Sequence, residues 1–345
     1  MKHLYDCFLG EKRTSVYLAR QVDDIIETIK ASQKIALWVC DSTTTNFLAV
    51  PEINKVVLES GEISKKWDSV EQICAAAVRL RMGRDGVVIG FGGGVVCDIA
   101  GFAASMYMRG CSLALVPTTL LAMVDASLGG KTAIDIFGIK NLVGSFYPAR
   151  HLYLCPPLLS SLPVKEFING LGEVIKHALL SPDSRLMELL ETKKNKILSL
   201  DTMVLQELVI ASLEVKRRYI ESDPREEIGL RAMLNLGHTF AHALETVGNL
   251  FSWSHGEAVA WGTVKALQAG VALRVTDEPY AHRAIAVFES YGFDIHHRVK
   301  ETKRFLEALE GDKKRSGSSI RFVIMQTQGK GTLQHLDQSL IISII

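Results

Sequence analysis

A strand-like apolar run leads directly into three glycines and then into a helix rich in small residues. The run covers residues 85–91 (DGVVIGF), the glycines are residues 92–94, and the helix is expected over 98–110. Glycines in such a turn let backbone N–H groups approach a phosphate at the positive end of the helix dipole. The dinucleotide fingerprint G-x-G-x-x-G is incomplete, because Val95 occupies its last position. A tight strand–helix turn therefore remains the alternative to a nucleotide site.

Strand and helix patterns alternate around this motif. Short apolar runs at 34–41, 55–60 and 111–119 flank a helical pattern at 67–82, which predicts βαβ units and a parallel sheet. Asp41 ends the first run and could accept a hydrogen bond from a ribose hydroxyl, although aspartate also begins turns. After residue 155 the patterns are helical, at 164–195, 201–222, 227–248, 255–275 and 278–292, with an extended run at 319–326.

We therefore predict two domains, a Rossmann-like α/β domain over 1–155 and a mainly α-helical domain over 156–345. A cleft between two such domains is a common place for a ligand, and we expect the active site there.

Composition excludes several classes of protein. The chain of 345 residues is 48% hydrophobic and 22% charged, with a net charge of +1, so nothing indicates a nucleic-acid partner. No window is apolar for long enough to span a membrane, and residues 1–15 lack the apolar region of a secretion signal. The six cysteines are scattered without a CxxC pair, which favours reduced thiols in a cytoplasmic protein.

Metal-ligating residue types occur in three helical patterns. In RAMLNLGHTFAHALE (231–245), the spacing of Arg231, Asn235, His238 and His242 predicts one side of a single helix. Glu173 lies in a helix that looks buried, and His255 begins another helix. Three protein ligands with one open position are typical of catalytic zinc, and spacing alone allows either or both of the paired histidines as ligands.

Basic residues accompany these candidate ligands. They are Lys131, Lys176, Lys216, Arg231 and Lys313, the last in a predicted basic turn over 311–317. So many cations beside one metal indicate an anionic substrate with phosphate and carboxylate groups.

Taken together, the motifs resemble the 3-dehydroquinate synthase family of sugar-phosphate cyclases. The matching stretches run from about residue 58 to 325: GGGVVCDIAGFAASMYMRG, VPTTLLAMVDASLGGKTAID, KNLVGSFY, GLGEVIKHALL, GLRAMLNLGHTFAHALE, HGEAVAWG and DKKRSGSSIRFV. The resemblance implies conversion of 3-deoxy-D-arabino-heptulosonate 7-phosphate to 3-dehydroquinate and phosphate, a step of the shikimate pathway to aromatic amino acids. It implies transient oxidation by bound NAD+, phosphate elimination, re-reduction and an intramolecular aldol closure.

The resemblance also assigns residues. It makes Glu173, His238 and His255 the ligands of Zn2+, with Co2+ as a possible replacement, and it pairs His242 with Glu227 in proton transfer. The implied catalytic set is Glu227, His242, Lys131, Lys176, Lys216, Arg231 and Asn235. The substrate-binding set is Arg109, Asp125, Asn141 and Lys313. The NAD+ set is Asp41, Glu62, Lys65, Gly93, Gly94, Val95, Asp98, Thr118, Thr119, Lys131, Lys140 and Asn169. A homodimer is expected on the same ground.

The chain departs from the family pattern at three positions. Cys97 and Gly172 replace a usual glycine and a usual alanine, and Pro148 stands where glutamine is usual. Cys97 lies near the start of a helix, so we weigh an activated thiol against a small buried packing residue. Three alternative functions remain: another sugar-phosphate cyclase, a metal-dependent polyol or glycerol-phosphate dehydrogenase of similar architecture, and a non-catalytic metabolite-binding relative.

Overall fold

The computed structural model describes residues 1–32, 34–248, 253–316 and 320–345, without the side chains of 311–316. The chain divides into two compact units, Met1–Pro163 and Val164–Ile345, and each is described by itself. The sequence places the domain boundary after residue 155, just before the 3-10 turn Pro156–Ser161. That boundary and the cleft stay predictions.

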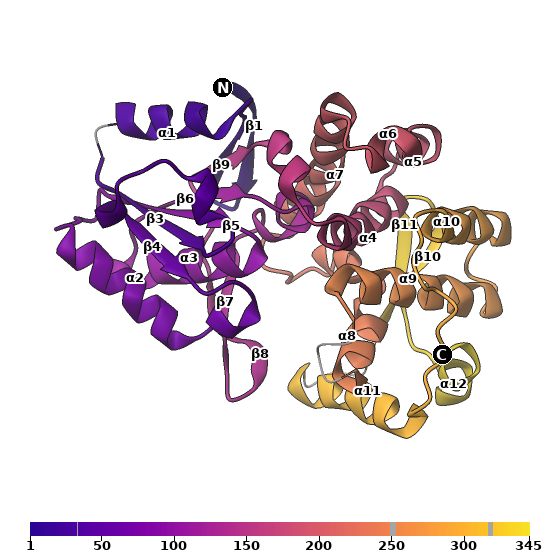
Figure 1. Ribbon diagram of the computed structural model, residues 1–345. Coiled ribbons are helices and arrows are strands. Elements are labelled where there is room, and N and C mark those ends of the chain that lie inside the picture. The colour runs from indigo at the N-terminus through magenta and orange to yellow at the C-terminus, as the bar shows by residue number, and fades with distance from the viewer. Residues whose placement is uncertain (33, 249–252, 317–319) are drawn as a thin grey trace. The chain divides into compact units, whose positions relative to one another are not determined.

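The first unit is built on a seven-stranded sheet with the order β1-β2-β9-β6-β5-β3-β4 (Figure 1). All neighbouring strands run parallel except the β1–β2 pair. The strands are β1 (Lys2–Leu9), β2 (Lys12–Leu18), β3 (Ala36–Asp41), β4 (Lys55–Leu58), β5 (Val87–Gly92), β6 (Ser112–Pro117) and β9 (His151–Leu154). The predicted parallel sheet is confirmed.

The strand order shows where a ligand would bind. After the β1–β2 hairpin the chain forms β3, adds β4 on one side, and then adds β5, β6 and β9 on the other side. Strand order therefore reverses between β3 and β5, and in open α/β sheets ligands bind beyond the carboxyl ends of the strands at such a point. Asp41 ends β3 and Gly92 ends β5, so both lie at this edge of the sheet.

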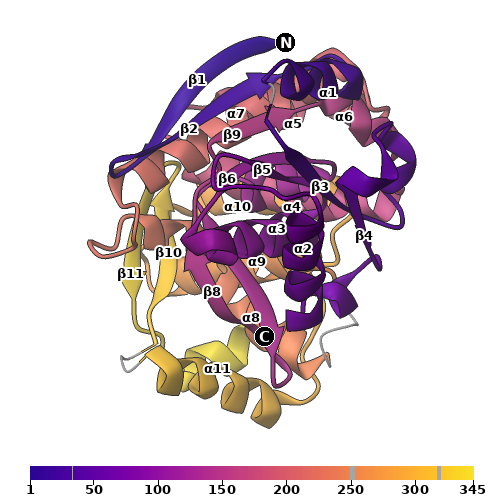
Figure 2. The same cartoon turned by 90° about the vertical axis from the view of Figure 1, so that its left-hand side faces the viewer.

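Helices cover both faces of the sheet. Figures 1 and 2 show α1 (Val22–Ala31) on one face, and α2 (Trp67–Arg79) and α3 (Gly94–Met106) on the other. A separate hairpin is formed by β7 (Lys131–Ile136) and β8 (Ile139–Phe146), and it packs against α3. The sequence patterns predict no element at β1, β2, α1, β7 or β8.

The second unit is mainly helical, as predicted. Its helices are α4 (Val164–Leu180), α5 (Arg185–Thr192), α6 (Lys194–Leu198), α7 (Thr202–Ser222), α8 (His238–Val247), α9 (His255–Ala272), α10 (Glu278–Ser290), α11 (Thr302–Ser316) and α12 (Gln338–Ile344), with a hairpin of β10 (Phe322–Thr327) and β11 (Lys330–Gln334). The apolar helix α9 packs against α4, α8, α10 and β10, and its Trp261 is fully buried. Among the described residues, no helix is both long and apolar enough to cross a membrane.

Three predicted elements are wrong in extent. The helix predicted over 227–248 begins only at His238, because the chain first forms the 3-10 turn Arg231–Asn235 and then takes a left-handed conformation at Gly237, the N-cap of α8, with φ of +79°. The run 164–195 is broken between α4 and α5, where Pro182 lies. The basic segment predicted as a turn over 311–317 belongs to α11 up to Ser316.

Candidate metal centre and nucleotide loop

Three predicted metal ligands converge within the helical unit. Glu173 lies in α4, while His238 and His255 are the first residues of α8 and α9. One ligand atom from each lies within 4.8 Å of the others. Glu173 Oε1 is 3.5 Å from His238 Nε2 and 3.4 Å from His255 Nε2. Residues far apart in the sequence therefore present one carboxylate and two imidazole nitrogens to a single point.

The other ring nitrogen of each histidine faces an acceptor. His238 Nδ1 lies 3.3 Å from the carbonyl oxygen of Leu236, and His255 Nδ1 lies 3.4 Å from Glu245 Oε1. Metal-binding histidines are usually oriented in this way, by a backbone carbonyl or a carboxylate on the nitrogen that does not bind the ion. Glu245 was not predicted, because its role depends on α8 and α9 lying side by side, which spacing does not reveal.

Glu173 has the environment of a ligand carboxylate. It is fully buried, and Lys176 Nζ lies 2.5 Å from its Oε2. Neither carboxylate oxygen has a partner with hydrogen-bond geometry among the described residues, although four basic groups lie around them, those of Lys176, His177, His238 and His255. Buried carboxylates are normally hydrogen-bonded or coordinate a metal, so this arrangement fits a divalent cation.

The electrostatics of the centre also favour a cation beside the carboxylate. Burial raises the pKa of Glu173, but the Lys176 charge and the two imidazoles outweigh it and hold that pKa well below its usual range. Burial and Lys176 lower the pKa of His238, which favours the neutral form that binds metals. Burial lowers the pKa of His255 as well, yet Glu173 and Glu245 together raise it to about 10. Both carboxylates thus stabilise positive charge at this point.

Close backbone contacts set the positions of the predicted ligands. A Cβ on Gly172 would lie 2.3 Å from the carbonyl oxygen of Gly256, and a Cβ on Gly256 would lie 1.7 Å from that of Asn169. Next to His238, a Cβ on Gly237 would lie 2.6 Å from the backbone nitrogen of Thr263 in α9. Helix α9 thus approaches the chain closely beside Glu173 and again beside His238. The departure at Gly172 has a physical reason, because the usual alanine would push α9 outward.

The start of α9 is fixed in addition by side chains. Ser254 caps the helix in a capping box with Glu257, whose Oε2 accepts the Ser254 backbone N–H at 2.8 Å. Asn169 Oδ1 accepts the backbone N–H of Gly256 at 2.6 Å. Asn169, which the resemblance assigned to NAD+, is therefore bonded in the structure to the helix that begins with His255.

Several predicted substrate groups lie near the ligands, but not on one helix. Lys176 Nζ donates to the carbonyl oxygen of Leu234 at 2.8 Å, and Lys216 and Arg231 are buried. The His242 side chain is exposed, with its ring centre 5.5 Å from that of His238. The prediction that Arg231, Asn235, His238 and His242 share one side of a single helix is wrong, because the chain turns at Gly237.

The loop before Arg231 is organised by an aspartate that was not predicted. Asp223 accepts backbone N–H groups of Glu227 at 2.8 Å, Ile228 at 3.3 Å and Arg231 at 3.1 Å. Burial raises the pKa of Asp223, but the backbone donors have the larger combined effect. The pKa of Asp223 is therefore lower than its usual value. The side chain of Glu227 is exposed, whereas Glu226 accepts a hydrogen bond from Asn235 Nδ2 at 2.9 Å.

In the α/β unit, the predicted glycine loop lies between β5 and α3. Gly93 caps α3 and Gly94 is its first residue. A Cβ on either glycine would lie 3.4 Å from the nearest side-chain carbon, an ordinary contact distance. The packing of the chain therefore does not require glycine at 93 or 94, and an approaching ligand remains a reason for it.

Asp41 is engaged within its own turn. Its Oδ1 accepts the backbone N–H groups of Thr43 at 3.0 Å and Thr44 at 2.8 Å, and the Thr44 hydroxyl at 2.9 Å. Thr44 Oγ1 also lies 3.2 Å from the carbonyl oxygen of Phe91 at the end of β5. The turn-forming role weighed for Asp41 is thus present in the structure, at the switch point of the sheet.

A charged cluster links the segment before α2 with α3 and β8. The buried Lys65 Nζ lies 2.7 Å from Asp98 Oδ2 in α3 and donates to Asn141 Oδ1 in β8 at 2.5 Å. Asp135 accepts the backbone N–H of Asn141 at 2.7 Å and was not predicted. Burial lowers the pKa of Lys65, but Asp98 and Glu62 raise it above its usual value, so the lysine is charged. Three predicted site residues are brought together here.

The structure places the remaining predicted site residues in both exposed and buried positions. Arg109 is exposed and follows α3 with φ of +64°, a conformation uncommon outside glycine. Thr118 is buried after β6, and Thr119 Oγ1 accepts the backbone N–H of Ala122 at 3.1 Å. The others are Glu62, Lys131 and Lys140, which are exposed, and Val95 and Asp125, which are half-buried. Lys313 lies outside the residues whose side chains the structure describes.

Of the two interpretations of Cys97, the activated thiol is wrong. The side chain is buried in α3, 3.8 Å from the carbonyl oxygen of Gly92, and burial raises its thiol pKa far above the usual value. The dipole of the helix does not offset this loss of solvent. Cys97 is a packing residue.

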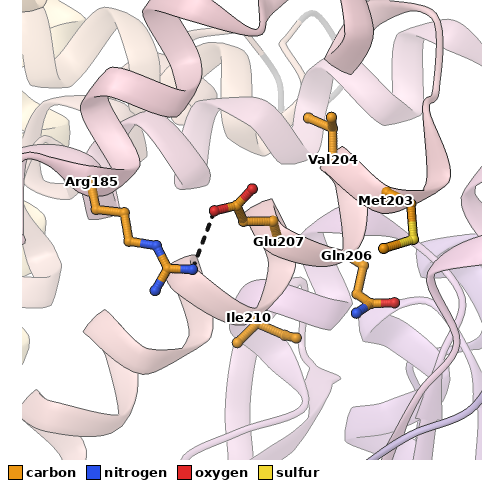
Figure 3. Close-up of a pocket in the computed structure, with 6 residues that line it drawn as sticks. All are labelled: Arg185, Met203, Val204, Gln206, Glu207 and Ile210. Carbon is orange, nitrogen blue, oxygen red and sulfur yellow. Dashed lines mark hydrogen bonds and ion pairs between the residues drawn. The ribbon is translucent and has the colours of Figure 1, made fainter.

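A surface recess between α5 and α7 contains none of the predicted residues. It encloses about 300 Å³, and its walls include Arg185 and Glu207, an exposed ion pair at 3.2 Å (Figure 3). An exposed pair of this kind contributes little stability and is no catalytic arrangement.

A doubly wound α/β unit followed by a mainly helical unit defines a class of two-domain fold. Solved members include a 2-epi-5-epi-valiolone synthase from Streptomyces hygroscopicus with NAD+ and Zn2+ bound, whose TM-score is 0.85 at 23% identity, with 99% of this chain and 98% of that chain covered. A 2-deoxy-scyllo-inosose synthase complexed with carbaglucose-6-phosphate, NAD+ and Co2+ has a TM-score of 0.84 at 21% identity over the same shares. These likenesses establish the fold.

Sequence similarity is more specific. Residues 55–169 match the family model of the 3-dehydroquinate synthase N-terminal domain, and residues 170–315 match that of the C-terminal domain. A 3-dehydroquinate synthase from Halorhodospira halophila is 37% identical over 330 residues, covering 93% of this chain and 92% of the relative. The chain spans only 43% of a bifunctional 3-dehydroquinate synthase/phosphatase from Fusobacterium nucleatum. The chain belongs to the 3-dehydroquinate synthase family.

Proposed function

We propose that the chain is a 3-dehydroquinate synthase, a phosphate-eliminating carbon–oxygen lyase. It converts 3-deoxy-D-arabino-heptulosonate 7-phosphate to 3-dehydroquinate and inorganic phosphate, with no net change in oxidation state. The observation that carries the proposal is the buried Glu173 carboxylate, to which the Nε2 atoms of His238 and His255 are both directed. This centre occurs within a chain that belongs to the family.

Two cofactors belong to the proposal. Zn2+, or Co2+ in its place, would be held by Glu173, His238 and His255, and NAD+ would be held beyond the carboxyl ends of β3 and β5, with Gly93 and Gly94 beside its phosphates. When bound, the metal supplies a Lewis acid for the substrate hydroxyls, and NAD+ supplies a hydride acceptor that later returns the hydride. Related structures that contain NAD+ with Zn2+ or Co2+ support this assignment.

The polar residues of the helical unit would bind and orient the substrate. Lys176 is buried and fixed by Leu234 and Glu173, so its charge lies beside the metal ligands. Lys216 and Arg231 are buried cations suited to the carboxylate and phosphate oxygens of the substrate. His242 is exposed beside His238 and is suited to move a proton.

The α/β unit would contribute further groups to both partners. We assign Arg109, Asp125, Asn141 and Lys131 to the substrate, and Lys65, Asp98, Thr118, Thr119 and Lys140 to NAD+. Lys65 contacts both Asp98 and Asn141, and these contacts support the assignment of neighbouring groups to NAD+ and to the substrate. The family resemblance of the whole constellation supports the rest.

A homodimer and a cytoplasmic location are also proposed. The dimer rests on family membership, and size-exclusion chromatography with light scattering tests it. The location is supported by the six cysteines, which are all free thiols.

The test of function offers the purified, zinc-loaded protein the heptulosonate phosphate together with NAD+. Release of inorganic phosphate with no lasting absorbance at 340 nm is expected, because the hydride returns to the substrate. Sustained NADH formation would indicate a polyol or glycerol-phosphate dehydrogenase instead. Turnover of a different sugar phosphate, with none of this substrate, would indicate another sugar-phosphate cyclase.

A further inference from the structure

Two adjacent glutamates lie in the loop between α7 and Arg231, and their side chains differ in exposure and in hydrogen bonding. The side chain of Glu227 is exposed, and its described hydrogen bond is the backbone N–H to Asp223 at 2.8 Å. The side chain of Glu226 is half-buried, and its Oε1 accepts a hydrogen bond from Asn235 Nδ2 at 2.9 Å. The family resemblance had assigned the carboxylate of this loop to Glu227.

The backbone conformation at Glu226 is energetically unfavourable. Glu226 has φ of +63°, in the left-handed region that side chains other than glycine and asparagine rarely adopt. The Asp223 carboxylate holds this conformation in place, because it binds the backbone N–H groups of Glu227, Ile228 and Arg231 on the far side of Glu226. Strained residues that surrounding contacts fix in place cluster at functional sites.

The partner of Glu226 belongs to a short segment that contacts the metal centre on both sides. The carbonyl oxygen of Leu234 accepts Lys176 Nζ at 2.8 Å, and Lys176 pairs with the ligand Glu173. The carbonyl oxygen of Leu236 lies 3.3 Å from Nδ1 of the ligand His238. Asn235 lies between these two contacts. Glu226 therefore contacts, through Asn235, the short segment whose carbonyl oxygens face Lys176 and His238.

We infer that Glu226, and not Glu227, is the carboxylate of this loop that serves the substrate site, as a positioning residue for Asn235. By accepting from Nδ2, Glu226 fixes which way the Asn235 amide points and leaves its Oδ1 to accept a substrate hydroxyl. The inference rests on the proposed function, since Asn235 is assigned to the substrate there.

The test compares alanine at the two glutamates in the zinc-loaded, full-length protein. Glu226→Ala is expected to lower kcat/KM about 10- to 100-fold, the range for a lost hydrogen bond to a charged group. Glu227→Ala is expected to lose clearly less. Glu226→Gln keeps an oxygen that accepts from Asn235, so it should stay within about threefold of wild type, although a carboxylate that transfers a proton would not be replaced by an amide.

A double-variant comparison tests whether Glu226 acts through Asn235. Glu226→Ala combined with Asn235→Ala should lose no more activity than Asn235→Ala alone, because the two residues act as one unit. The rise in melting temperature that substrate causes in zinc-loaded protein without NAD+ should shrink in Glu226→Ala and persist in Glu226→Gln. Zinc content, measured in each variant, is expected to stay at the wild-type level.

The outcomes separate failure of the inference from failure of the function. A wild-type protein that releases no phosphate refutes the proposed function and leaves the binding readout to judge Glu226. An active wild type in which Glu227→Ala is the worse variant, or in which Glu226→Gln is as damaged as Glu226→Ala, overturns the inference. If Glu226→Ala does not fold, Glu226→Asp replaces it, since its shorter side chain withdraws the carboxylate from Asn235 while retaining the charge.

Discussion

The two units of the chain use glycine for opposite purposes. In the helical unit, Gly172, Gly237 and Gly256 have backbone atoms where a methyl group would go, at 2.3, 2.6 and 1.7 Å. In the α/β unit, Gly93 and Gly94 have room for a methyl group, with nearest atoms at 3.4 Å. Glycine is required by the protein itself in the first case. In the second case the packing of the protein does not require glycine, but a ligand that approaches the backbone would require it.

This difference shows how each half of the site is positioned. The proposed metal ligands Glu173, His238 and His255 lie next to glycines at which helix backbones nearly touch, so backbone packing fixes their separation. The proposed nucleotide side instead relies on contacts between side chains, such as Lys65 with Asp98 and Asn141. Substitutions should therefore damage the two halves in different ways.

The largest effect is expected from removing a ligand of the helical centre. His238→Ala and His255→Ala should each abolish turnover and lower the zinc content, because three ligands leave no replacement. His242→Ala should keep the metal and slow turnover by about 10²- to 10⁴-fold, as expected for a general acid–base group. Zinc content by elemental analysis, measured beside kcat, checks this division. Equal loss of zinc from His238→Ala and His242→Ala would instead make the two histidines a joint chelate.

The glycine comparison itself gives the next largest effect. Gly256→Ala should destabilise the protein by about 3 kcal/mol or more and release zinc, because the new methyl group meets the Asn169 backbone at 1.7 Å. Gly93→Ala should change stability by less than about 1 kcal/mol and weaken NAD+ binding instead.

Thermal unfolding and NAD+ titration of the two glycine variants provide the measurement. A strongly destabilised Gly93→Ala protein, or a Gly256→Ala protein with normal stability and full zinc, would erase the contrast between the two units.

The buried lysines extend the comparison to charge. Lys65 in the α/β unit is paired with Asp98, and its pKa is raised. Lys265 Nζ in α9 lies 5.2 Å from the Trp261 ring centre and donates to Gln268 Oε1 at 3.4 Å. Burial lowers the pKa of Lys265 to about 8. In the unfolded chain Lys265 keeps its proton up to the ordinary lysine pKa of 10.5, so between these values the unfolded state binds more protons and stability rises with pH.

Lys265→Met should therefore stabilise the protein by roughly 1–3 kcal/mol at neutral pH. The gain is fully present below about pH 8 and shrinks as the pH rises towards 10.5. Lys65→Met should destabilise the protein at neutral pH, because Asp98 loses its cation. Denaturant unfolding of both variants at about pH 7 and about pH 10 measures the two effects. A gain in stability for Lys265→Met that does not depend on pH would show that the lysine charge is not the cause.

The smallest effect is expected at Cys97, beside the glycine loop. Iodoacetamide should label the partly exposed Cys74 well before the buried Cys97, with or without NAD+. Cys97→Gly should remain active, with a modest loss of stability from the small cavity. Mass spectrometry of the labelled peptides measures both sites, and rapid NAD+-sensitive labelling of Cys97 would restore the interpretation as an activated thiol.

The sequence by itself determined the family and the parallel sheet, and its resemblance to the family predicted the three ligands. Alternation of apolar runs with helical patterns predicts βαβ units, and the strand–glycine–helix order at 87–94 is local enough to be read directly. Glu173 and His255 stand in stretches whose helical periodicity survives in α4 and α9. Such patterns are short-range, because side-chain periodicity follows from the geometry of one element.

Tertiary structure decided the rest, because it depends on contacts between distant segments. The pattern over 227–248 is helical in sequence, yet the left-handed Gly237 breaks it so that His238 begins a helix beside α9. Which glutamate of the 226–227 pair turns inward is set by Asp223 and Asn235, and no spacing encodes that choice. The strands of the β7–β8 hairpin, and the Lys65 contact it receives, also follow from packing against α3. Burial, not the local helix dipole, sets the state of Cys97.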